Sequence, residues 1–137
     1  MKESKKKRPS LPPVSEQMKA WSSALADEVG SWPLVECRSF FGFTALYRRD
    51  RIFAVLPRTR AMQTPDSLAF KLEAASPKIR ARLERDPSIG FALMQMRGKR
   101  WFTFEIHRDE DLHDALDWLG RAYAAVLKSV NKPRKPR

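Results

Sequence analysis

Apolar residues recur at helical spacing in two stretches of the chain. The first stripe predicts a helix over residues 15–30, and it consists of Met18, Trp21, Leu25 and Val29. At 3.6 residues per turn these side chains share one face. Ser15 stands where an N-cap is expected and Gly30 where the helix should stop. The second stripe predicts a longer helix from about residue 109 to 130, formed by Leu112, Leu116, Leu119, Tyr123, Val126 and Val130.

Between these helices, period-two alternation and β-branched or aromatic residues predict strands. Three are expected at residues 34–40, 41–48 and 51–56, paired as an antiparallel hairpin or meander with a tight turn at Arg49-Asp50. Others are expected at residues 67–72, 89–96 and 101–106. Ser76-Pro77 resembles an N-cap followed by proline at the first helical position, which predicts a short helix between the strands at 67–72 and 89–96. This order predicts an α+β fold, an antiparallel sheet with N- and C-terminal helices packed on one face.

Alternation also assigns side chains to faces. Phe102, Phe104 and Ile106 share one strand face and are expected in the core, so Trp101 should point away from it. Trp21 and Trp118 fall on or beside the helix stripes and are also expected in the core. Cys37 is the only cysteine, which excludes an internal disulfide, and its place in a predicted strand indicates a small buried side chain.

The net charge of +11 is concentrated near the ends of the chain. Residues 1–10 contribute +4 (five bases, one acid), residues 131–137 another +4 (four bases), and residues 11–130 only +3 (18 bases less 15 acids). Charged, proline-containing segments of this kind bury too little apolar surface to offset the entropy of ordering. We therefore expect a disordered basic tail at 1–13, one domain at 14–130 and a second disordered tail at 131–137.

The sequence lacks the usual signatures of catalysis, cofactor binding and membrane insertion. It contains no nucleophile elbow, phosphate-binding loop or dinucleotide fingerprint. His107 and His113 match no metal-ligand spacing, so a solvated acidic helix face is the simpler interpretation of their surroundings. No apolar run approaches the roughly 20 residues of a membrane span, and residues 1–10 do not resemble a secretory signal. We expect a non-enzymatic cytoplasmic protein without cofactor or metal.

The candidate chemistry is binding through basic and aromatic side chains. Nucleic acid is the expected ligand of one group of residues, which comprises Arg48, Arg49, Arg51, Arg58, Arg60, Lys99, Arg100 and Trp101. A strand that carries bases beside an aromatic ring can neutralise phosphate and stack nucleobases. Two alternatives stay open: the arginines are ordinary solvated charge, and Trp101 is covered by the short helix or by a dimer partner.

Several segments resemble known families. Residues 40–47 (FFGFTALY), 52–56 (IFAVL) and 68–72 (LAFKL) resemble strands of the TfoX N-terminal domain family. Residues 98–104 (GKRWFTF), followed by a helix that contains Tyr123, are similar to the related MmcQ/YjbR family. The resemblance covers about residues 15–130, with Phe43 in place of the family's second glycine. It implies a secretion-chaperone-like α+β fold and supplies no catalytic residue.

The resemblance and the charge layout together predict a small regulatory or binding protein. Some TfoX proteins regulate competence, and YjbR-like proteins are often described as DNA-binding. The expected partner is therefore nucleic acid, bound without sequence preference through the basic tails and the arginines. The alternative is a protein-interaction module or homodimer without nucleic-acid binding.

Overall fold

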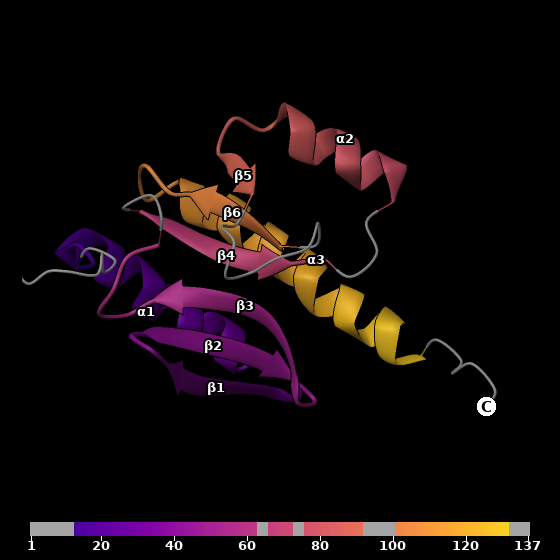
Figure 1. Ribbon diagram of the computed structural model, residues 1–137, viewed down its shortest axis with the longest axis horizontal. Helices are drawn as coiled ribbons and strands as arrows, with labels where there is room; N and C mark the ends of the chain where they lie inside the picture. The colour runs from indigo at the N-terminus through magenta and orange to yellow at the C-terminus, as the bar shows by residue number, and fades with distance from the viewer. Residues whose placement is uncertain (1–12, 63–65, 73–75, 92–100, 132–137) are drawn as a thin grey trace, which may run out of the picture.

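The computed structural model describes residues 13–62, 66–72, 76–91 and 101–131. Six strands form one antiparallel sheet with the spatial order β1-β2-β3-β4-β6-β5 (Figure 1). The strands are β1 (Val35–Phe40), β2 (Phe43–Arg48), β3 (Arg51–Pro57), β4 (Ser67–Lys71), β5 (Ile89–Phe91) and β6 (Trp101–Glu105). The helices are α1 (Glu16–Gly30), α2 (Pro77–Arg85) and α3 (Asp111–Asn131). The predicted α+β class is confirmed.

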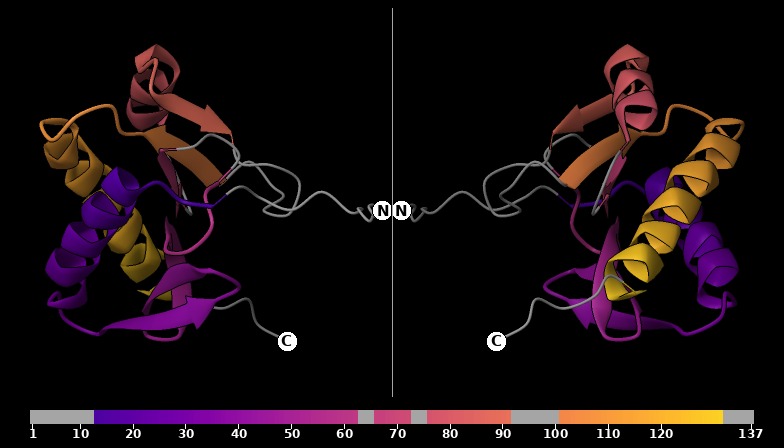
Figure 2. Two further views of the ribbon diagram at one scale, coloured as in Figure 1. Left: turned by 90° about the vertical axis from the view of Figure 1, so that its left-hand side faces the viewer. Right: turned by 90° about the vertical axis from the view of Figure 1, so that its right-hand side faces the viewer.

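Helices α1 and α3 cover one face of the sheet, here called the helix face (Figure 2). The main core lies between these helices and the sheet, and the predicted stripe of α1 is buried in it: Met18, Trp21, Leu25 and Val29. The stripe predicted for α3 is displaced: Leu119 and Val126 are buried as expected, but Leu112, Leu116 and Tyr123 are only partly buried, and Ala115, Trp118 and Ala122 complete the buried face. A smaller cluster forms on the opposite side of the sheet, here called the second face. It comprises Phe43, Val55, Met62 and Ala69, with Ile52 and Trp101 packed against them. The prediction that Trp101 points away from the main core is confirmed.

Local side-chain hydrogen bonds set the starts of the helices. The Ser15 hydroxyl accepts a hydrogen bond from the Met18 amide at 3.0 Å, and the Ser76 hydroxyl accepts one from Ile79 at 3.2 Å. Before α3, the Asp111 carboxylate accepts from the amides of His107 and Arg108. Each satisfies amides that lack an intrahelical partner. The predicted caps Ser15 and Ser76 are therefore confirmed.

A β-bulge explains the unbroken apolar run in β3. Leu46 pairs with Ala54 and Tyr47 pairs with Ile52, which leaves Phe53 as an extra residue in the ladder. Phe53 and Ala54 consequently both belong to the main core, whereas Ile52 and Val55 belong to the second-face cluster. The bulge thus places two consecutive apolar side chains, Phe53 and Ala54, on the helix face.

Two sequence predictions are wrong in detail. The strand expected at 41–48 begins only at Phe43, because Phe41 and Gly42 form the β1–β2 turn, with φ of 48° and 89°. Cys37 is exposed rather than buried, because β1 is an edge strand that α1 covers incompletely. Strand β5 ends at Phe91, and the rest of the predicted strand at 89–96 lies outside the described residues, as do residues 1–12 and 132–137.

No helix within the described ranges is long and apolar enough to cross a membrane. The longest, α3, has 21 residues and carries Asp111 and Asp114 in its first turn. These carboxylates lie where the helix dipole favours negative charge, and the buried stripe of α3 faces the sheet.

The environment of Cys37 predicts a thiol that is accessible but reacts slowly with disulfide reagents at neutral pH. Its pKa is raised above the ordinary value, first by partial burial beside the end of α1 and second by the Asp27 carboxylate. Since the thiolate is the reactive form, we expect one equivalent of an aromatic disulfide reagent to react in the folded protein. The reaction rate rises with pH as the thiol ionises, and the midpoint of that rise should lie at a higher pH than for a free thiol. Asp27→Asn should lower that midpoint and Asp114→Asn should not; a thiol that is silent until unfolding would contradict the exposed position.

Candidate functional site

The structure separates the predicted arginines along the β2–β3 hairpin. Arg49 occupies the two-residue turn at one end, beside Arg51 at the start of β3. Arg58 and Arg60 follow β3 at the other end, about 20 Å away at 3.3 Å per strand residue. Lys99 and Arg100 lie outside the described residues. The described arginines of the predicted group therefore lie at two separate ends of the hairpin.

Arg48 is a buried structural residue. It is only 8% exposed, and its Nη1 donates a hydrogen bond to the Tyr123 carbonyl at 2.9 Å. The guanidinium also lies 3.8 Å from the centroid of the Tyr123 ring. Arg48 thus connects β2 to α3 and does not belong to a binding surface in this structure.

Trp101 lies at the same end of the sheet as Arg49 and Arg51. It is half-buried and pairs with Lys71 at the end of β4, against the cluster of the second face. Arg38, on the second face in β1, stacks 4.4 Å from the Tyr47 ring centroid and forms ion pairs with Glu36 and Asp50. Both hydrogen bonds raise the pKa of the Arg38 guanidinium, that to Glu36 the more strongly. Acids therefore offset the positive charge of Arg38.

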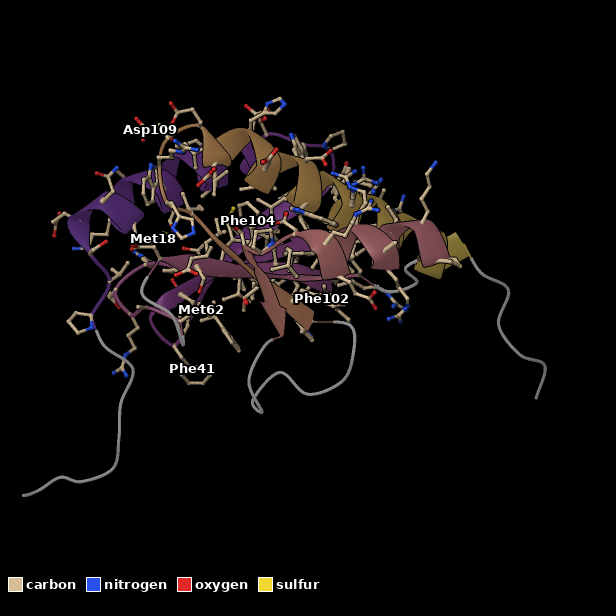
Figure 3. The ribbon with its side chains drawn as sticks, turned by 90° about the horizontal axis from the view of Figure 1, so that it is seen from above. Met18, Phe41, Met62, Phe102, Phe104 and Asp109 are labelled. Atoms are coloured by element: carbon tan, nitrogen blue, oxygen red, sulfur yellow. The ribbon has the colours of Figure 1, made fainter. Side chains whose placement is uncertain are left out.

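The opposite end of the sheet presents two exposed aromatic side chains. Phe40 ends β1 and Phe41 begins the turn, and they are 37% and 83% exposed. Their rings form an edge-to-face pair with centroids 5.1 Å apart. Figure 3 shows Phe41 projecting from the molecule on the side away from α1 and α3. An exposed aromatic pair of this kind indicates a contact surface.

Arg58 and Arg60 are held beside this pair by the Gly42 carbonyl. That oxygen accepts hydrogen bonds from the amides of Arg58, Thr59 and Arg60 at 3.2, 2.8 and 3.2 Å. Arg60 then lies so close to Gly42 that an added Cβ would sit 2.9 Å from its Cγ and Cδ. Gly42 is required here both for this approach and for its φ of 89°.

Arg58 donates from Nη1 to the Ser39 hydroxyl at 2.9 Å, which holds its side chain at the end of β1 on the helix face, beside α1. Within the described part of the chain, neither Arg58 nor Arg60 has an acidic partner. We call Phe40, Phe41, Arg58 and Arg60 the tip cluster. It combines two exposed rings with two positive charges that no carboxylate neutralises.

The backbone of Phe41 is strained. A bulky residue in the left-handed region costs about 1–2 kcal/mol relative to the right-handed one, and such residues concentrate at functional sites. Phe40 and Phe41 were absent from the predicted binding residues because both fall in segments where regular strands are expected. The Phe-Phe-Gly sequence before an alternating strand was the available signal, since glycine favours turns.

No protein-family model, curated protein or solved structure matches the chain. The resemblance to the TfoX and MmcQ/YjbR families therefore remains a prediction from the motifs alone.

Proposed function

We propose that this protein is a non-enzymatic binding protein for single-stranded nucleic acid, and that the tip cluster is its contact surface. The observation that carries the proposal is the exposed Phe40–Phe41 pair beside Arg58 and Arg60, whose amides bond the Gly42 carbonyl and which have no acidic partner among the described residues. Aromatic faces stack unpaired bases, and guanidinium groups neutralise the adjoining phosphates. The basic segments 1–10 and 131–137 add attraction that does not depend on sequence.

Single strands suit this surface better than duplex. Two rings at a turn can stack only on bases whose faces are accessible, and a duplex covers those faces with neighbouring bases. The four residues of the tip cluster lie at a strand end, in a turn and in the segment after β3, and none of them lies on a helix that could enter a groove. We therefore expect preference for single strands, little sequence discrimination and affinity that falls steeply with salt.

The test is fluorescence anisotropy with labelled oligothymidylate and a labelled duplex of equal length, using the full chain. Phe41→Ala should weaken single-strand binding about 5- to 150-fold, because stacking contributes about 1–3 kcal/mol per base. The double variant Arg58→Gln/Arg60→Gln should weaken binding further and reduce the salt slope by about two phosphate contacts. Folding stability should change by less than about 1 kcal/mol in Phe41→Ala, because the lost side chain is exposed.

The chain offers matched controls at the other end of the hairpin. Leu34→Ala removes another exposed apolar side chain with positive φ, and Arg49→Gln/Arg51→Gln removes the same charge as the tip variant. Both controls should bind nearly as tightly as the original. Equal losses in both charge variants would overturn the proposal, since binding would then be diffuse electrostatics. A second result would also overturn it: the protein sediments as a dimer, Phe41→Ala converts it to a monomer, and no nucleic acid binds. The tip cluster would then be a contact between two copies of the chain.

A further inference from the structure

A cleft lies between α1 and the paired ends of β2 and β3. Its volume is about 470 Å³, within the range of small-molecule sites. Lys19, Ser22, Ser23 and Asp27 line it from α1, and Thr44 and Arg58 from the sheet side. Apart from Arg58, these residues do not belong to the tip cluster.

Ser22 is the unusual member of this lining. It is 5% exposed, lies between core residues of α1, and its Oγ has no hydrogen-bond partner. A helical serine ordinarily bonds the carbonyl four residues earlier or faces water. A buried hydroxyl without a hydrogen-bond partner lowers stability unless a ligand or a water molecule forms the missing hydrogen bond. Ser22 therefore supplies a polar group that is already desolvated and available to a bound molecule.

The charges of the cleft are separated along the helix. Lys19 and Asp27 are eight residues apart on α1, which corresponds to about 12 Å between their backbone positions. Arg58 adds a second cation from the sheet side. The lining therefore has two cations, one carboxylate and hydroxyl groups, including Ser22 and Thr44, that can donate and accept. The Lys19 ammonium group also lies 3.4 Å from the exposed Glu16 carboxylate, a solvated pair that a bound oxyanion would have to compete with.

We propose that this cleft binds a small zwitterion that carries an oxyanion and an ammonium group. The cations Lys19 and Arg58 face the oxyanion, the Asp27 carboxylate faces the ammonium group, and the Ser22 hydroxyl bonds a polar atom of the ligand. A carboxylate and a phosphate would both satisfy the cationic side, so an amino acid and a phosphorylated amine are the two sources of this chemistry. The cleft shares Arg58 with the tip cluster, whereas Lys19, Ser22 and Asp27 belong to the cleft alone.

Titrations of the full chain followed by amide NMR test this assignment. The probes are γ-aminobutyrate and phosphoethanolamine, with butyrate and ethanolamine as controls that carry one charge each. At about 10 mM, a site with a dissociation constant of about 1 mM is mostly filled. Either zwitterion should shift the amides of Ser22 and Thr44 at concentrations where butyrate and ethanolamine do not. The zwitterion that binds more tightly identifies the preferred oxyanion.

Two variants distinguish the site from general surface binding. Ser22→Ala should weaken the better probe about fivefold, which is the loss of one hydrogen bond, while the free protein melts at the same or a higher temperature. Asp27→Asn should reduce a zwitterion to the affinity of its single-charge analogue, and Asp114→Asn on α3 should change nothing. The proposal is overturned if no probe shifts these amides, if the single-charge controls bind equally well, or if Ser22→Ala leaves affinity unchanged.

Discussion

Replacing Phe70 by alanine should destabilise the protein by about 3–5 kcal/mol, the range for removing a buried phenylalanine. Phe70 is fully buried in β4, near the middle of the sheet. Its ring stacks on Trp118 of α3, with centroids 5.5 Å apart, and on Phe102 of β6 at 5.9 Å. The substitution therefore leaves a cavity where the sheet meets the helix layer.

Urea unfolding followed by far- and near-ultraviolet circular dichroism measures this loss. Since single domains are stable by about 5–15 kcal/mol, the variant should lose a large fraction of its stability. Phe41→Ala is the matched control, because it makes the same chemical change at an exposed ring and should cost less than about 1 kcal/mol. Similar losses in the two variants would contradict the stacking of Phe70 between β6 and α3.

Arg48→Ala should cost about 2–5 kcal/mol, far more than loss of a surface arginine. The estimate combines a hydrogen bond from a charged donor, about 1.5–3 kcal/mol, with a cation–π contact of about 0.5–2 kcal/mol. The acceptor is the carbonyl of Tyr123, whose own hydroxyl donates to the Pro33 carbonyl at 2.8 Å. The Tyr123 ring also packs edge-to-face against Trp32 and Phe53. Loss of Arg48 therefore weakens the contact between the hairpin and α3.

Arg48→Met separates packing from polar contacts. Methionine keeps an apolar stem in the same space and removes the buried Nε that has no partner, so it should cost about half as much as alanine. Arg80→Ala, an exposed helical arginine, should stay within about 0.5 kcal/mol of the original. Thermal and urea unfolding give all three values. An Arg48→Ala variant as stable as Arg80→Ala would contradict the buried position of Arg48.

Much of the candidate site escaped prediction because sequence neighbours in a hairpin separate in space. Arg48 and Arg49 are adjacent, yet one side chain is buried against α3 and the other lies in an exposed turn. Arg58 and Arg60 belonged to the predicted group, but Phe40 and Phe41 did not. The turn at Phe41-Gly42 brings those rings to two arginines that follow almost 20 residues later. Only the antiparallel register of β1, β2 and β3 creates that proximity.

Elements whose signals are local could be predicted from the sequence. Caps at Ser15 and Ser76, the stripe of α1 and the alternation at residues 101–106 depend on contacts within a few residues. The existence of α3 was predicted too, but its buried face is centred on Ala115, Trp118 and Ala122, which lie beside the predicted stripe. Tertiary structure alone decided the strand order, the exposure of Cys37 on an edge strand, the cleft at Ser22 and the tip cluster. Periodicity specifies which way a side chain points along its own element. It carries no information on which distant element, if any, packs over it.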